Sequence, residues 1–225
     1  MPTAKAEPIS IALKAGKVSG LLVAPKDVRA VYVMAHGAGA GMAHPFMAAV
    51  AAGFAERGIA TVRYQFPYME TGSKRPDPPA VAHAAVRAAV DAARERFAKL
   101  PLFAGGKSFG GRMTSQAQAK APLDGVHGLV FFGFPLHAAG KPSRERAAHL
   151  SEVAVPMLFL QGTRDALAEL GELQPVCAAL GSRATLTLFA DADHSFHVPV
   201  RSGRKDAEVM AEMLDNAAEW IERRS

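Results

Sequence analysis

Ser108 lies between Gly106 and Gly110 in the pattern G-x-S-x-G, where its hydroxyl could act as a nucleophile. An apolar run at 102–104 precedes the motif, and the alanine- and glutamine-rich stretch 109–120 follows it as a predicted helix. A Cβ atom at either flanking glycine would crowd the neighbouring strand or helix. The pattern therefore predicts a sharp strand-to-helix turn with the serine at its apex.

Other interpretations of the glycine-rich segments fit the sequence less well. A phosphate-binding P-loop ending at Ser108 would need a glycine where this chain has Pro101. The glycines of 37–41 lack the dinucleotide-binding spacing, because Met42 occupies the last glycine position. The next strand ends at 63–65 without the acid that would bind a ribose. An ordinary glycine-rich turn around Ser108 remains an alternative.

A serine hydroxyl becomes a good nucleophile only when a base takes its proton, and a third group must orient that base. His194 follows the last predicted strand and is the candidate base. Asp165 follows the strand predicted at 157–161 and is the candidate acid. The order Ser, Asp, His along the chain is typical of one class of hydrolases.

Each of these roles has a competing interpretation. Asp165 also suits the N-cap of a helix that would begin just after it. His197 could replace His194 as the base, although it lies further from the strand. Asp191 or Asp193 could serve as the acid only if the imidazole were oriented locally.

Backbone N–H groups are expected to bind the oxyanion that forms during attack on a carbonyl group. The N–H of Phe109, at the start of the predicted helix, is one candidate donor. The second is Ala38 or Gly37, in the loop that follows His36 at the end of an earlier strand.

The elements that must position these residues alternate between strands and helices along the whole chain. Apolar runs predict strands at 9–13, 18–24, 29–35, 59–64, 102–104, 126–132, 157–161 and 184–189. Helices are predicted at 45–57, 80–99, 109–120, 143–150, 167–180 and 206–223. This order indicates an α/β fold with a mainly parallel sheet covered by helices on both faces. The candidate residues then share the edge formed by the carboxyl ends of the strands.

Composition indicates the number of domains and argues against several classes of protein. The 225 residues predict a single domain over 1–225, with 49% hydrophobic and 21% charged residues. The net charge of +5 comes from scattered basic residues, which argues against nucleic-acid binding. No apolar stretch is long enough for a membrane span and the N-terminal sequence lacks a signal-peptide core, so we expect no membrane association and a cytoplasmic location. The single Cys177 is expected to be core filler.

Over essentially its whole length, the chain resembles the α/β-hydrolase family, in particular small members without a large cap domain, similar to dienelactone hydrolase. The stretches GFPLH (133–137), GKP (140–142) and DHSF (193–196) look like a branch of hydrolases that includes testis-expressed and NSL-complex-subunit proteins. The resemblance implies a triad of Ser108, His194 and Asp165 and no metal or organic cofactor. Dienelactone hydrolases proper use a cysteine nucleophile, so their substrate does not follow for this chain.

The leading hypothesis is therefore a serine hydrolase that acts on a small carboxylic ester or thioester, as a monomer or homodimer. Some members of the resembling branch are scaffolds, so a catalytically silent interaction protein is the alternative, and a peptidase is a third possibility. The side chains expected to line the substrate pocket come mainly from the loops 66–79 and 133–142: His36, Phe66, Tyr68, Met69, Lys107, Phe134 and Leu136. An anionic substrate could be favoured by basic residues, namely Lys107, Lys74, Lys141 and Arg164.

Overall fold

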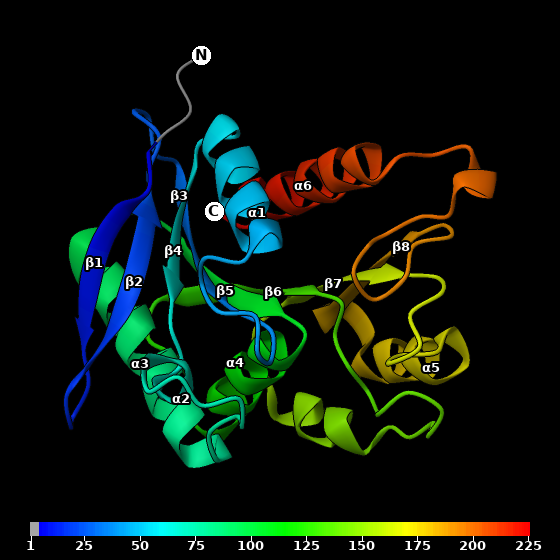
Figure 1. The fold of residues 1–225 in the computed structure, drawn as a ribbon, viewed down its shortest axis with the longest axis horizontal. Helices are drawn as coiled ribbons and strands as arrows, with labels where there is room; N and C mark the ends of the chain where they lie inside the picture. Colours follow the sequence, from blue (N-terminus) through cyan, green and yellow to red (C-terminus); the bar gives the residue numbers. More distant parts are fainter. Residues whose placement is uncertain (1–4) are drawn as a thin grey trace.

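The computed structural model describes residues 5–225, so the first four residues of the N-terminal sequence lie outside the described part. Its centre is an eight-stranded sheet with the order β1-β2-β4-β3-β5-β6-β7-β8 (Figure 1). The strands are β1 (Glu7–Ala12), β2 (Lys17–Val23), β3 (Ala30–Ala35), β4 (Ile59–Tyr64), β5 (Leu102–Lys107), β6 (Val126–Phe132), β7 (Met157–Gly162) and β8 (Ala184–Phe189).

The sheet is parallel from β4 to β8, and β2 runs antiparallel to both of its neighbours, β1 and β4. Ala35 at the end of β3 pairs with Gly106 near the end of β5. The carboxyl ends of the parallel strands, which carry the candidate residues, therefore lie at the same edge of the sheet. The predicted α/β fold with a mainly parallel sheet is confirmed.

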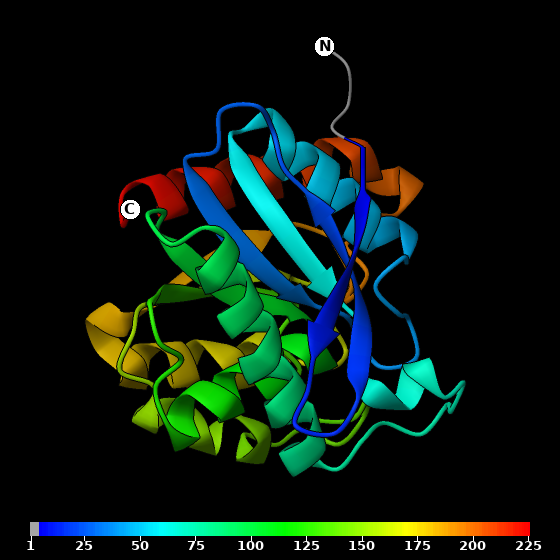
Figure 2. The ribbon, with the colours of Figure 1, turned by 90° about the vertical axis from the view of Figure 1, so that its left-hand side faces the viewer.

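Two layers of helices enclose the sheet (Figures 1 and 2). On one face, α3 (Pro79–Arg96), α4 (Phe109–Lys120) and α5 (Leu170–Leu180) contribute to one apolar cluster. On the other face, α1 (Pro45–Glu56) and α6 (Asp206–Glu222) contribute to a second cluster. A long apolar sheet is stable only when both faces are covered in this way.

The position of β3 between two helical layers explains why its sequence is apolar throughout. All six residues of AVYVMA are buried. Val31 and Val33 point into the cluster with α3 and α4, whereas Tyr32 and Met34 point into the cluster with α1 and α6. Because successive side chains of a strand point to opposite faces, a strand buried on both sides needs a continuous apolar run.

The structure corrects the predicted elements at four places. Helix α5 begins at Leu170 rather than at 167, because residues 165–168 form a turn that ends with Ala168 N–H donating to the Asp165 carbonyl. The helix predicted at 143–150 is a 3₁₀ helix, η1 (Glu145–Glu152). The loop 66–79 contains a short helix, α2 (Pro67–Glu70), which begins at a proline. Strand β5 extends to Lys107.

Between β6 and β7, residues 133–156 form only a loop and η1, so no large cap domain covers this edge of the sheet within the described residues. Two further 3₁₀ turns, η2 (Gly181–Arg183) and η3 (Val200–Ser202), flank β8. In the described part of the chain, none of the helices combines the length and apolar character that a membrane span requires.

Candidate active site

The predicted turn at Ser108 is present, and close approach of β3 explains its glycines. Ser108 has φ of 50°, a left-handed conformation that non-glycine residues rarely adopt. A Cβ atom on Gly106 would lie 2.1 Å from the Ala35 carbonyl oxygen, and one on Gly110 would lie 2.4 Å from the same oxygen. The strain at Ser108 directs its side chain away from the sheet, toward the loops that follow the other strands.

A continuous chain of hydrogen bonds joins three of the predicted site residues. His194 Nε2 lies 2.9 Å from Ser108 Oγ, and His194 Nδ1 lies 2.7 Å from Asp165 Oδ2. Asp165 is buried, whereas Ser108 and His194 are partly exposed. With Nδ1–H donating to the carboxylate, Nε2 is left as the acceptor for the serine proton.

Two further groups hold the Asp165 carboxylate. The backbone N–H of Leu167 donates to Oδ1 at 2.8 Å, and the Gln161 side-chain amide donates to Oδ2. Gln161 also accepts a hydrogen bond of 3.0 Å from the Phe134 N–H through its own carbonyl oxygen. No motif in the sequence singles out Gln161. Its signal is a polar residue at the end of an otherwise apolar strand, where its side chain is fully buried.

The competing candidates have other partners. Helix α5 begins at Leu170 with Glu169 as its N-cap, so Asp165 does not cap it. His197 is exposed, and its Nδ1 lies 2.8 Å from Asp206 Oδ2. Asp193 accepts the backbone N–H groups of residues 195 and 197 and so shapes the loop around His194. Asp191 is exposed, and its backbone N–H donates to Thr163.

Lys107 lies behind the nucleophile rather than projecting freely into solvent. Its ammonium group donates a hydrogen bond of 2.6 Å to the backbone carbonyl of His194. The nitrogen lies 5.4 Å from the centre of the Phe196 ring and 5.8 Å from that of Phe46. Burial lowers the pKa of Lys107 to about 8, against the opposing attraction of Asp165 and Asp193.

The candidate oxyanion donors separate into two groups. Ala38 and Phe109 line the same cavity as Ser108. Gly37 is buried behind them, and a Cβ atom at that position would lie 3.7 Å from Lys107 Cγ and 3.9 Å from Ser108 Cβ. Of the two residues considered for the second donor, Ala38 is thus the one that lines the cavity.

Several residues expected in the substrate pocket belong to the core instead. Phe66, Phe134 and Leu136 are fully buried, because the loops that carry them fold back over the sheet. Tyr68 is almost fully buried, and its hydroxyl accepts a hydrogen bond of 2.9 Å from the Gly39 N–H. Met69 packs against the same core cluster.

His36 is also part of the interior rather than of the pocket surface. Its Nε2 accepts a hydrogen bond of 3.1 Å from the Phe66 N–H, and its Nδ1 lies 2.8 Å from the Gly37 carbonyl. Burial lowers the pKa of His36, although the contact with the Gly37 carbonyl partly opposes this shift. A neutral ring with Nδ1–H satisfies both contacts, so His36 fixes the Gly37 loop against the loop at Phe66.

A cavity of about 430 Å³ opens next to Ser108. Its volume lies within the range of small-molecule pockets. The cavity is lined by residues from six segments of loops and helices: Ala38, Pro76, Asp77, Pro79, Ser108, Phe109, Arg112, Met113, Pro135, Arg146 and Leu167. No motif in the sequence singles out Arg112, although its position four residues after Ser108 places both on one face of a helix. Lys74, Lys141 and Arg164 are exposed and do not line this cavity.

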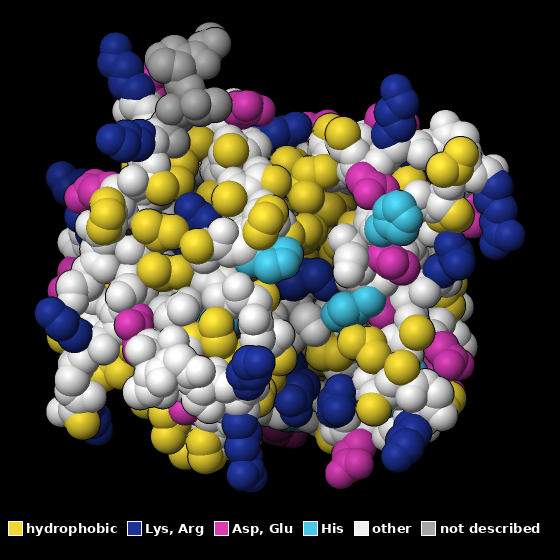
Figure 3. Space-filling model, viewed as in Figure 1, with side chains coloured by type: hydrophobic (Ala, Val, Ile, Leu, Met, Phe, Trp, Pro, Cys, Tyr) yellow, Lys and Arg dark blue, Asp and Glu magenta, His cyan; other side chains and the backbone are white. Residues whose placement is uncertain are grey.

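Figure 3 shows histidine side chains beside a hollow in the middle of one face, with Lys and Arg side chains below them.

Burial in the core raises the pKa of Cys177 to about 12, so this thiol is protonated at neutral pH. Within residues 5–225, His, Cys, Asp and Glu side chains form no group of three suited to a metal ion.

Comparisons with known proteins agree with this architecture. A family model described as an alpha/beta hydrolase domain matches residues 28–222. A dienelactone hydrolase from Anabaena variabilis has 21% identity and a TM-score of 0.80, with 99% of each chain covered. An alpha/beta serine hydrolase without a lid, from Xanthomonas campestris, has 22% identity and a TM-score of 0.75, covering 98% of this chain and 96% of that one. An alpha-beta serine hydrolase homologue from Coxiella burnetii has 20% identity and a TM-score of 0.76, covering 93% of this chain and 96% of that one.

Proposed function

The chain belongs to the α/β-hydrolase family, and from this premise we propose that it is a serine hydrolase that cleaves a small carboxylic ester or thioester. The observation that carries the proposal is the unbroken chain of hydrogen bonds from Ser108 through His194 to Asp165. The adjoining cavity of about 430 Å³ supports a small substrate.

In the proposed reaction, Ser108 Oγ attacks the carbonyl carbon while His194 Nε2 takes the hydroxyl proton. The carbonyl oxygen becomes an oxyanion, which the backbone N–H groups of Phe109 and Ala38 would bind. His194 then gives its proton to the leaving alcohol or thiol, and the acyl group stays on Ser108. Asp165 keeps the imidazole oriented and stabilises its cationic form.

Deacylation repeats these steps with water as the nucleophile. His194 takes a proton from water, the resulting hydroxide attacks the acyl carbon, and Ser108 leaves as its hydroxyl after regaining the proton. In the described residues no cap domain covers this edge of the sheet, which supports entry of water. The products are a carboxylic acid and a free, regenerated enzyme.

Fluorophosphonate labelling of the purified protein tests whether Ser108 is an activated nucleophile. We expect labelling of the wild-type protein and none of Ser108→Ala. Ser115→Ala is a matched control, because Ser115 Oγ also contacts a histidine, His149 Nε2 at 2.7 Å, but Ser115 is fully buried. This control should be labelled like the wild type.

Ester hydrolysis by histidine variants tests the base. His194→Ala should lower kcat/KM roughly a thousandfold or more, as removal of a triad member does in other enzymes. His197→Ala should keep wild-type activity, because its ring contacts Asp206 and not Ser108. A well-folded wild-type protein that neither takes the label nor hydrolyses esters would favour the non-enzymatic interaction protein.

A further inference from the structure

We propose that Arg112 and Arg146 bind a carboxylate group carried by the substrate, so that this enzyme acts on anionic rather than neutral esters or thioesters. Both arginines line the cavity that contains Ser108. The inference rests on the proposed hydrolase function and assigns a substrate class to the same site.

Arg112 is held next to the nucleophile. It lies one turn into α4, and its backbone N–H donates a hydrogen bond of 3.1 Å to the Ser108 carbonyl. Its guanidinium carbon lies 5.9 Å from the centre of the Phe109 ring. The side chain is therefore directed along the wall of the cavity, close to where the carbonyl group of a substrate would bind.

The Arg112 guanidinium lacks the partners that a partly buried charge normally has. Its Nε atom is buried and has no hydrogen-bond partner among the described residues. Burial lowers the pKa of Arg112, and the nearby positive charge of Arg146 lowers it further. Such a pair of like charges is unfavourable until an anion lies between them.

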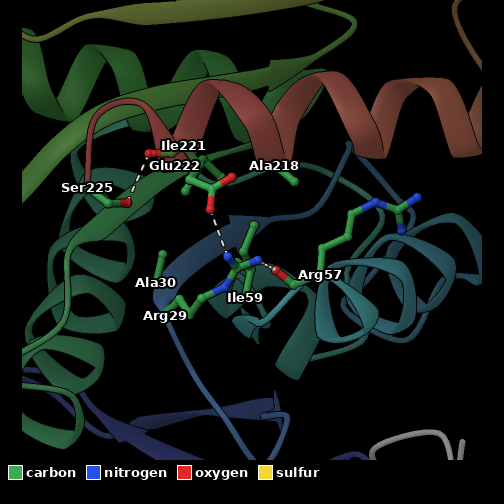
Figure 4. A pocket seen from close by; sticks show the side chains of 8 residues that line it. All are labelled: Arg29, Ala30, Arg57, Ile59, Ala218, Ile221, Glu222 and Ser225. Carbon is green, nitrogen blue, oxygen red and sulfur yellow. Dashed lines mark hydrogen bonds and ion pairs between the residues drawn. The ribbon is translucent and has the colours of Figure 1, made fainter.

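Other arginines of the chain show what satisfied partners look like. Arg144, two residues before Arg146, forms an ion pair of 2.7 Å with Glu172. In a separate cavity of about 200 Å³ at the opposite end of the strands (Figure 4), Arg29 donates to Glu222 at 2.7 Å and to the Arg57 carbonyl at 3.0 Å. Arg112 and Arg146 form no such ion pair with the described carboxylates.

The charges that line the Ser108 cavity also indicate which anion fits. Asp77 is the acidic residue of the lining, and its Oδ2 accepts the Tyr68 N–H at 2.9 Å. Two guanidinium groups and one carboxylate leave one positive charge, which a monoanion balances. A guanidinium presents parallel N–H donors that match the two oxygens of a carboxylate.

Matched pairs of synthetic esters test the preference on both sides of the scissile bond. On the acyl side, mono-4-nitrophenyl adipate is compared with its neutral methyl-capped form. On the leaving-group side, 4-carboxyphenyl butyrate is compared with its neutral methyl ester. Wild-type kcat/KM should favour the anionic member of at least one pair by about tenfold or more, because a hydrogen bond between two charged groups is stronger than one to a neutral group.

Removal of either arginine should reduce this preference. In Arg112→Met and in Arg146→Met, kcat/KM should fall about tenfold further for the anionic ester than for its neutral partner. Arg144→Met removes the same charge nearby but outside the cavity, and it should keep the wild-type preference. Because each comparison is a ratio between two esters, a general loss of activity or folding cancels.

A binding measurement separates failure of this inference from failure of the proposed function. Calorimetry should detect binding of monomethyl adipate, a monoanion, to Ser108→Ala and its loss when Arg146→Met is added. Such binding in a protein that hydrolyses no ester would support the anion site and overturn the hydrolase. Equal kcat/KM for anionic and neutral esters together with no binding of monomethyl adipate would overturn the anion site alone. Tighter binding of diethyl phosphate, also a monoanion, than of monomethyl adipate would overturn the assignment to a carboxylate.

Discussion

Lys107 and His194 are joined by a hydrogen bond of 2.6 Å between the lysine ammonium group and the histidine backbone carbonyl. The residue that precedes Ser108 thus holds the loop that carries the proposed base. The contact links the end of β5 to the loop after β8, two segments far apart in sequence. It makes Lys107 a positioning residue in the proposed reaction, because it acts on the imidazole through the backbone.

Replacement of Lys107 by methionine should therefore lower kcat more than it changes KM. We expect a decrease of about tenfold, since loss of a hydrogen bond from a charged donor allows the base to drift from its productive geometry. Lys74→Met is the control, because Lys74 is an exposed lysine on a loop that does not line the cavity. Steady-state kinetics that show equal kcat for wild type and Lys107→Met would contradict the positioning role.

The lowered pKa of Lys107 also predicts how stability depends on pH. Between the folded value of about 8 and the ordinary value of 10.5, the unfolded chain binds a proton that the folded protein has released. The free energy of unfolding should therefore rise across this range, by roughly 1 to 3 kcal/mol from this group. In Lys107→Met this rise in unfolding free energy with pH should be absent. Urea unfolding at pH 7.5 and pH 10 should show this difference between the two proteins, and parallel changes would rule it out.

Gln161 should matter for both stability and activity. Gln161→Leu leaves the Phe134 N–H without its acceptor and removes one of the two donors to Asp165 Oδ2, the other being His194. We expect a loss of about 1 to 3 kcal/mol in unfolding free energy and a decrease in kcat of roughly tenfold. Gln118→Leu is the matched control: it also removes a buried amide acceptor, for the Leu123 N–H, but far from Asp165. If both variants lose the same activity, Gln161 has no special role at the site.

Gly110 should tolerate no side chain. In Gly110→Ala the new Cβ would lie 2.4 Å from the Ala35 carbonyl oxygen and 2.6 Å from that of His36, and neither backbone group can move freely. A destabilisation of about 3 kcal/mol is expected from such overpacking. Gly171→Ala, in α5 with nothing within 4 Å, should instead raise the unfolding free energy by about 0.5 to 1 kcal/mol. Thermal or urea unfolding measures both, and a stable Gly110→Ala would show that the turn is looser than described.

The sequence by itself determined the arrangement of strands and helices and singled out Ser108, Asp165 and His194. These inferences depend on local properties. An apolar run such as β3 has no other stable place than between two helical layers, and the glycines around Ser108 permit a turn that other residues cannot make. Chain order then assigns the three residues to the same edge of a parallel sheet.

Only the tertiary structure decided which side chains meet at that edge. The sequences of the loops after β4 and β6 are compatible with two arrangements. Their aromatic side chains could face either a substrate or the core. In the structure Phe66 and Phe134 are buried, and Arg112 and Arg146 line the cavity instead. The direction in which a loop folds depends on contacts with distant segments, such as the bond from Phe134 N–H to Gln161, and no local pattern in the sequence encodes these contacts.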